Sequence, residues 1–225
     1  TDFISNVSHE LKTPLAAIQN YGTLLHEDAL SEQQKVEYAK GITEQTKRLS
    51  GLITNILKLN RLENQQIFPE RKQYNLAEQI RECLLLFEQS WENKNIHIDV
   101  ELEDETYIYE DAELLSIVWN NLFSNAIKFT DFGGTIGIKV KKEALHITVE
   151  VSDSGCGISP ETGKHIFDKF YQGNTSHAVQ GNGLGLTLVK RVIDIVGGDI
   201  KVQSTVGEGS TFIVYLRENI TENNL

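Results

Sequence analysis

One histidine near the start of the chain, His9, has the position of a reactive group. The apolar residues around it recur at alternating steps of three and four, which predicts a helix with one committed face. These residues are Ile4, Val7, Leu11, Ile18, Tyr21 and Leu25. His9 then lies on the opposite, exposed face with Glu10 beside it and Thr13 one turn along. Pro14 removes one helical amide and predicts a bend. The pattern disfavours an imidazole packed in the core. The alternative that His9 is an incidental surface histidine stays open.

A second group of polar side chains lies on one face of a later predicted helix. Asn121 and Asn125 are four residues apart, and Lys128 follows closely. Amide oxygens suit a hard cation that already carries phosphate, because Mg²⁺ takes few protein ligands and completes its shell with phosphates and water. Lys128 can neutralise a phosphate. A solvated helix face is the alternative, and it explains either asparagine alone better.

An acid and two glycines end a predicted strand. Asp153 can accept a hydrogen bond from an exocyclic amine, while Gly155 and Gly157 free the backbone that follows it. The alternative is an ordinary Asp-x-Gly turn.

A second glycine-rich segment, 181–186, opens the predicted helix 186–196. Bare amides and the helix dipole at such a start suit a phosphate group. The preceding polar stretch 172–182 lacks any period, and we expect it to form a mobile cover. The glycine spacing differs from the dinucleotide-binding fingerprint.

The elements that carry these residues fall into two domains. Helices are predicted from Asp2 to Leu25 and from a capping box at Ser31 and Gln34 onward. A lone helical hairpin cannot bury both apolar stripes, so two copies are expected to form a four-helix bundle. The polar stretch 61–75 marks the boundary. The predicted domains are 1–66 and 75–225, joined by a linker over 67–74.

The second domain alternates helices and strands. Helices are predicted at 76–91, at 111–129 and at 186–196, with a short one opened by Ser159 and Pro160. The first of these has Asn75 as its cap, with Glu78 three residues later. Strands are predicted at 96–102, 135–140, 145–151, 199–204 and 211–216. This order predicts an α+β fold, a mixed sheet with helices covering one face.

Composition narrows the class of protein. The net charge of −11 opposes binding to nucleic acid or to an anionic membrane. Two distant cysteines indicate a reducing, cytoplasmic setting, and no apolar run reaches the ~20 residues that span a bilayer. The absence of methionine predicts that the chain is a piece of a longer protein, so we expect any membrane anchor to lie upstream.

Five segments together resemble the catalytic core of sensor histidine kinases of two-component systems, over nearly the whole chain. They occur in the order of that family. They are the phospho-acceptor box Ser8–Pro14, the asparagine box Asn120–Phe129, the first glycine box Asp153–Gly157, the phenylalanine box Ile166–Tyr171 and the second glycine box Gly181–Leu186. The resemblance implies an all-α hairpin that dimerises as a four-helix bundle, followed by an α+β sandwich of the type shared with gyrase, heat-shock chaperone and mismatch-repair ATPases.

The resemblance also implies a reaction. His9 is expected to attack the γ-phosphate of ATP with Glu10 as base, and the phosphoryl group then passes to an aspartate of a response regulator. Thr13 is expected to orient water when the same protein dephosphorylates that partner.

The resemblance assigns further roles to the nucleotide site. Asn125 and Asn121 are expected to hold Mg²⁺, Lys128 to meet the phosphates and Asp153 to hold the adenine amine. The other residues assigned to the pocket are Phe129, Gly155, Gly157, Ile158, Phe167, Phe170, Tyr171, Gly181, Gly183, Leu184, Gly185, Leu186 and Thr211. The expected cofactors are ATP and Mg²⁺, and the expected partners are a second copy and the receiver domain of a response regulator.

One residue departs from the family pattern. Many relatives carry an arginine after the phenylalanine box, where this chain has Gln172. We expect slower autophosphorylation than in an arginine-bearing relative, and an unchanged rate in Gln172→Arg would contradict this. Two alternatives stay open: a nucleotide-binding or phosphatase-dominant module with little kinase activity, and an ATP-driven clamp that uses the same nucleotide fold.

Overall fold

A computed structural model of the chain describes residues 3–27, 29–64, 66–103, 105–143, 146–173 and 181–217. The chain divides into two units, Thr1–Arg61 and Leu62–Leu225. In the described ranges, no helix is both long enough and apolar enough to cross a bilayer.

The first unit is a helical hairpin. It consists of α1 (Phe3–Leu24) and most of α2 (Glu32–Asn64), as the apolar periodicity predicted. Near the connection, the rings of Tyr21 and Tyr38 lie 6.0 Å apart. A Cβ atom on Gly41 would stand 2.6 Å from the Tyr21 ring, so only glycine leaves room for this aromatic contact.

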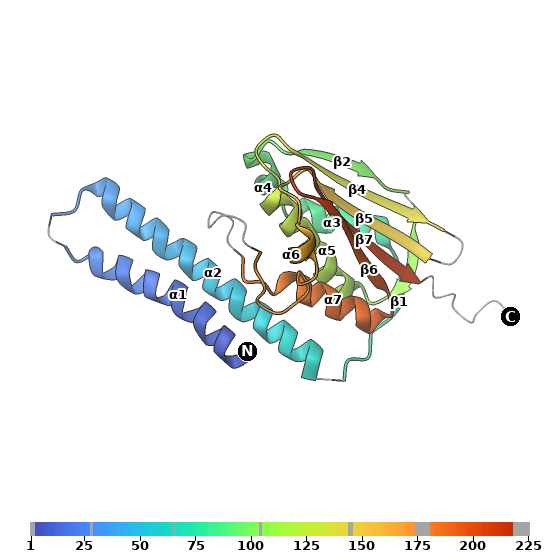
Figure 1. Cartoon of the computed structure of the whole chain (residues 1–225), viewed down its shortest axis with the longest axis horizontal. Coiled ribbons are helices and arrows are strands. Elements are labelled where there is room, and N and C mark those ends of the chain that lie inside the picture. Colours follow the sequence, from blue (N-terminus) through green and yellow to red (C-terminus); the bar gives the residue numbers. More distant parts are fainter. Residues whose placement is uncertain are drawn as a thin grey trace. The chain divides into compact units, whose positions relative to one another are not determined.

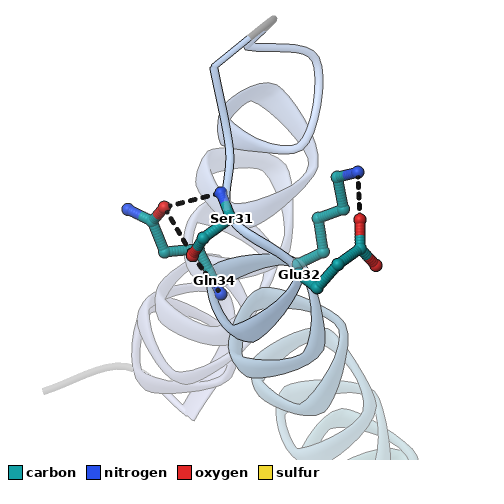
Figure 2. Close-up of polar contacts among 4 residues, drawn as sticks. Ser31, Glu32 and Gln34 are labelled. Carbon is teal, nitrogen blue, oxygen red and sulfur yellow. Dashed lines mark hydrogen bonds and ion pairs between the residues drawn. The ribbon is translucent and has the colours of Figure 1, made fainter.

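The predicted capping box opens α2 (Figure 2). The Ser31 amide donates to Gln34 Oε1 at 2.9 Å, and the Gln34 amide donates to Ser31 Oγ at 3.2 Å. Each side chain satisfies an amide that the first helical turn leaves without a partner. This local bonding explains why the helix begins here after the break in the apolar pattern.

The second unit contains a five-stranded mixed sheet in the order β2-β4-β5-β7-β6. Strand β2 is parallel to β4 and the other neighbours are antiparallel. The helices α3, α5 and α7 cover one face of this sheet (Figure 1). Its elements are α3 (Leu76–Leu85), α4 (Glu88–Asn93), β2 (His97–Glu101), α5 (Ala112–Phe129), β4 (Thr135–Lys142), β5 (His146–Asp153), α6 (Pro160–Gly163), α7 (Gly185–Val196), β6 (Asp199–Thr205) and β7 (Gly209–Arg217). The predicted α+β class is confirmed.

Strands β1 (Lys72–Asn75) and β3 (Tyr107–Glu110) pair antiparallel in a separate two-stranded sheet. The sequence did not predict these two strands. The end of the predicted linker is therefore folded. Arg71 Nε donates to Glu110 Oε1 at 3.0 Å, and Glu110 is only 2% exposed. The Glu70 amide donates to Asp111 Oδ2 at 2.8 Å. These bonds hold the chain from Glu70 onward to the second unit.

Side-chain bonds fix α3 against α5. Gln79 Oε1 accepts from both Tyr74 Oη and Trp119 Nε1 at 3.0 Å. Burial raises the pKa of Tyr74, so its hydroxyl stays protonated and keeps donating. Trp119 is fully buried, and its indole N–H thus has the partner that a buried donor requires.

The predicted helix 76–91 is two helices, which corrects the sequence analysis. Asn75 caps α3 through the Glu78 amide, as predicted. The Phe87 amide then bonds the Leu84 carbonyl three residues back, and α4 begins at Glu88. The run of apolar residues 83–87 hides this break, because a continuous apolar stretch has no period to interrupt.

Candidate functional site

The phospho-acceptor box lies on α1 with its histidine exposed. His9 and Thr13 are exposed, and Glu10 is half-buried. The Thr13 hydroxyl lies 3.4 Å from the His9 carbonyl oxygen, to which it donates. This i to i−4 bond places Thr13 one turn below His9 on the same face. The exposure predicted for the imidazole is confirmed.

The asparagine box forms the second half of α5. Asn121 Nδ2 donates to the Ile117 carbonyl oxygen at 2.7 Å. Its Oδ1 faces Gly185, where a Cβ atom would stand 2.8 Å away. The amide oxygen is thereby directed at the start of α7. Asn125 lies one turn further along α5 and is half-buried.

Lys128 lies at the end of the same helix. Its Nζ is 4.7 Å from the centre of the Phe129 ring, and a Cβ atom on Gly181 would collide with that Nζ. Lys128 thus contacts the second glycine box at Gly181, and Asn121 contacts it at Gly185. Two predicted site segments far apart in sequence are adjacent here.

Asp153 ends β5 and turns into the first glycine box. Its Oδ1 accepts from the Gly155 amide at 2.9 Å. Burial raises the pKa of Asp153, and hydrogen bonds from the Gly155 and Ser210 amides partly oppose that rise. A half-buried carboxylate with acceptor capacity to spare suits a ligand that brings an N–H donor.

The first glycine box needs its glycines for contact and for conformation. A Cβ atom on Gly155 would collide with the Phe129 carbonyl oxygen, and one on Gly157 with the Thr205 carbonyl oxygen. Gly157 also has a φ of +69°, in the left-handed region that disfavours other residues. The box is therefore pressed between the end of α5 and the β6–β7 turn.

Ser204, which the sequence did not single out, holds this box from β6. Its Oγ accepts from the Ile158 amide and donates to the Gly209 carbonyl oxygen, both at 2.8 Å. The Gly207 amide donates to the Cys156 carbonyl oxygen at 2.8 Å. The only signal in the sequence is a serine shortly before a G-x-G turn, which by itself indicates a hairpin. Thr211, which was assigned to the pocket, pairs with Ser152 on the neighbouring strand β5.

The phenylalanine box and the second glycine box are joined by backbone contact. The Phe170 amide donates to the Gly183 carbonyl oxygen at 2.9 Å. Phe170 has a φ of +61°, and a Cβ atom on Gly183 would stand 2.7 Å from its Cα. Thr187 Oγ1 donates to the Phe167 carbonyl oxygen at 3.1 Å. The Tyr171 and His165 rings lie with their centres 5.3 Å apart and their planes tilted by 39°.

The start of α7 is suited to an anion. Its N-cap residue is Leu184, which has no side-chain acceptor for the first amides. The Leu184 amide itself donates to Asn182 Oδ1 at 3.2 Å. Helix α7 thus presents amides and the positive end of its dipole beside Asn121. Of the predicted cover 172–182, residues 174–180 lie outside the described residues, and Gln172 is exposed.

The donor chemistry fits Mg²⁺ bound with phosphates. Among the residues that the structure describes, no group of three or more His, Cys, Asp and Glu side chains could hold a metal ion by itself. Asn121, with its nitrogen bonded to α5, leaves an amide oxygen for a hard cation. Such a set needs the phosphates to complete the metal shell.

Comparison with known proteins agrees with this geometry. Residues 1–65 match the His Kinase A (phospho-acceptor) domain, and residues 110–220 match the histidine kinase-, DNA gyrase B- and HSP90-like ATPase family. The solved catalytic domain of the histidine kinase ThkA is 31% identical, with a TM-score of 0.60, and the match covers 66% of this chain and 96% of that one. The chain belongs to the sensor histidine kinase family.

Longer sensor kinases match across both units. Drug sensory protein A of Synechocystis sp. (strain ATCC 27184 / PCC 6803 / Kazusa) is 35% identical over 94% of this histidine kinase chain, which spans 34% of that relative's length. The crystal structure of histidine kinase ThkA in complex with response regulator protein TrrA is 26% identical with a TM-score of 0.80, and the match covers 96% of this chain and 61% of that one. The predicted combination of a phospho-acceptor hairpin with an ATPase-type fold is confirmed.

Proposed function

We propose that this chain is the catalytic core of a protein-histidine kinase that phosphorylates His9 from ATP and passes the phosphoryl group to an aspartate of a response regulator. The observation that carries the proposal is the convergence of α5, the end of β5 and the start of α7 in one unit. There Asn121 faces Gly185, Lys128 meets Gly181, and the Asp153 carboxylate lies beside the glycine turn. The other unit presents an exposed histidine.

The proposed reaction balances as a phosphoryl transfer. A neutral imidazole nitrogen of His9 attacks the γ-phosphorus, an N–P bond forms, the bond from the γ-phosphorus to the bridging oxygen breaks, and ADP leaves. Glu10, next in the chain, is proposed to take up the proton from the other ring nitrogen.

The nucleotide would be held by groups of three chemical kinds. Asp153 accepts from the adenine amine, the α7 amides and Lys128 meet the phosphates, and Asn125 with Asn121 would hold Mg²⁺. The metal, when bound, neutralises charge that develops on the phosphates. The protein side of catalysis is then mainly positioning of the γ-phosphate.

Labelling with γ-labelled ATP tests the kinase proposal. We expect acid-labile label on the chain that is absent in His9→Gln and retained in His26→Gln, a matched exposed histidine of the same hairpin. Label that persists in His9→Gln would contradict the proposal. Nucleotide binding without any label would favour the nucleotide-binding module instead.

A second candidate function, dephosphorylation of the regulator, is supported by Thr13. Its hydroxyl lies on the face that exposes His9, where it can orient a water toward a phosphoaspartate docked there. We expect Thr13→Ala to slow release of phosphate from a phosphorylated receiver domain while leaving His9 labelling intact. An equal loss of both activities would contradict a separate role for Thr13.

The functional form is proposed to be a homodimer with a response regulator as its partner. The hairpin leaves several large apolar side chains exposed, among them Ile4 and Val36 at 72% and 68%. A monomer gains nothing from such exposure, whereas a second copy would cover it. The complex of ThkA with TrrA concerns a relative, and it supports the expected partner class for this chain.

A further inference from the structure

Lys94 places its ammonium group at the carboxyl end of α5. Its Nζ donates to the carbonyl oxygens of Ile127, Lys128 and Thr130 at 2.8, 3.0 and 2.9 Å. The side chain is half-buried. None of the catalytic assignments above uses this residue.

The bonding is complete in chemical terms. A lysine ammonium has three donors, and here each has its own acceptor. The last carbonyl groups of a helix lack intrahelical partners and carry the negative end of its dipole, so a cation there is stabilising. A hydroxyl group could meet one of these carbonyl groups and a neutral amide two, whereas the ammonium group meets all three.

The backbone of Lys94 ties the same point to two further segments. Its N–H closes the end of α4, and its carbonyl oxygen accepts from the Gly133 amide at 2.8 Å. The next residue, Asn95, has a φ of +50°, uncommon for a residue with a side chain. The position of the ammonium group is thereby fixed from several directions.

The carboxyl end of α5 leads directly to the proposed nucleotide site. Lys128 and Phe129 are its last residues, and the Phe129 carbonyl oxygen presses on Gly155 so closely that a Cβ atom there would collide with it. The Gly155 amide in turn donates to Asp153 Oδ1 at 2.9 Å. A displacement of the last turn of α5 therefore moves the surface against which the Asp153 turn is packed.

We propose that Lys94 is a positioning residue of the nucleotide site. Its ammonium group fixes the last turn of α5, and through the Phe129 carbonyl this turn sets the place of Gly155 and of the Asp153 carboxylate. The inference rests on the proposed function, because it assumes that this pocket holds the nucleotide. The role proposed for Lys94 is indirect, because its ammonium group bonds only backbone carbonyl groups at the end of α5.

The test compares four variants of the full chain by ADP affinity in calorimetry. Lys94→Met keeps the length of the side chain and removes its donors, and Lys94→Arg restores charge and donors. Lys141→Met is a control on an exposed lysine of β4. Ile147→Val shortens a buried side chain near the start of β5, at the opposite end of that strand from Asp153, and controls for a general loss of stability. We expect Lys94→Met to weaken ADP binding about tenfold, Lys94→Arg to recover most of it, and the controls to stay within about twofold.

Hydrogen exchange at the Gly155 amide provides a readout that needs no nucleotide. It should speed up about tenfold in Lys94→Met and stay unchanged in Ile147→Val. Lys94→Gln replaces the methionine variant if that protein does not fold. Normal ADP affinity or unchanged Gly155 exchange in folded Lys94→Met or Lys94→Gln protein would overturn the proposal. If the parent chain neither binds ADP nor labels His9, the proposed function fails, while Gly155 exchange still decides the role of Lys94.

Discussion

Asp153 is an acid whose surroundings favour its protonated form. Burial at the end of β5 raises its pKa, and the amides of Gly155 and Ser210 oppose that rise only in part. An amine from a ligand would add a donor directed at the carboxylate and stabilise its charge. Under the role proposed for Asp153, nucleotide binding would therefore favour loss of the proton from this carboxyl group.

Replacement of this acid should remove base discrimination. In Asp153→Asn the side-chain oxygen can still accept from the Gly155 amide, but the new NH₂ group then opposes the adenine amine. We expect ATP affinity to fall about tenfold or more, and the preference for ATP over ITP, which lacks that amine, to disappear. Calorimetric titration with both nucleotides measures this. Asp99→Asn, at an exposed position of β2, is the matched control, and retained preference in Asp153→Asn would refute the assignment.

The raised pKa also predicts how stability changes with pH. Since the folded pKa lies above the unfolded value of about 3.9, the folded state binds the proton more tightly. The stabilisation that this group contributes is fully present below the unfolded pKa and is lost as pH rises through the folded pKa. Without nucleotide, the unfolding free energy of the parent chain should therefore fall relative to Asp153→Asn between about pH 3.5 and pH 7. Urea denaturation at both pH values measures it, and a constant difference would contradict the shift.

At the scale of elements, the proposed nucleotide site depends on how closely the first glycine box approaches the turn between β6 and β7. Gly157 combines a left-handed backbone with contact against Thr205. Gly197, after α7, has a similar φ of +74° but open space where a Cβ atom would lie. The two glycines separate the cost of backbone conformation from the cost of collision.

Alanine at each glycine tests this distinction. Gly197→Ala should cost about 1 kcal/mol of unfolding free energy from the backbone alone and leave ADP affinity unchanged. Gly157→Ala should cost more, about 2–3 kcal/mol, and weaken ADP binding because the turn must move. Thermal or urea unfolding with calorimetry measures both quantities. Equal effects of the two substitutions would show that contact with Thr205 has no role.

Local signals in the sequence predicted the elements that local physics determines. Neighbouring residues encode the Ser31 capping box, the Asn75 cap and the alternating strand that ends at Asp153. The structure contains all three. Strands β1 and β3 were missed because four-residue strands carry too little alternation to register.

The candidate site shows the same division. The residues of the five family segments were predicted from residue type and spacing. Ser204 and Lys94, in contrast, form hydrogen bonds with partners 46 and at least 33 residues away in the sequence. Only the folded chain reveals such partners, because nothing in the neighbouring sequence distinguishes this serine or this lysine from others.

At the scale of the whole molecule, the exposed apolar side chains of the hairpin bear on assembly. Leu57 and Val36 on α2 are 65% and 68% exposed, although both would favour burial. Each such side chain is worth about 1.5–3 kcal/mol when fully buried, so several together can support association of two copies.

A charge on this surface should oppose association. Leu57→Glu is expected to shift the chain toward monomer in analytical ultracentrifugation, by at least about tenfold in dissociation constant. Lys58→Glu, at the neighbouring exposed position, controls for added negative charge alone. A monomeric parent chain, or equal effects of the two substitutions, would contradict a dimer formed through this face.

Strand β7, the last strand in the described residues, lies between β5 and β6 in the sheet, and the glycine turn that precedes it holds the first glycine box. During synthesis, the helical hairpin therefore emerges from the ribosome well before its nucleotide-binding partner can close. A nascent chain halted ahead of Ser204 would already carry His9 yet lack the strand and turn that hold the first glycine box. Under the proposed function, each molecule would gain its acceptor histidine before its phosphoryl-donor site, and His9 could be phosphorylated only after β7 has been synthesised.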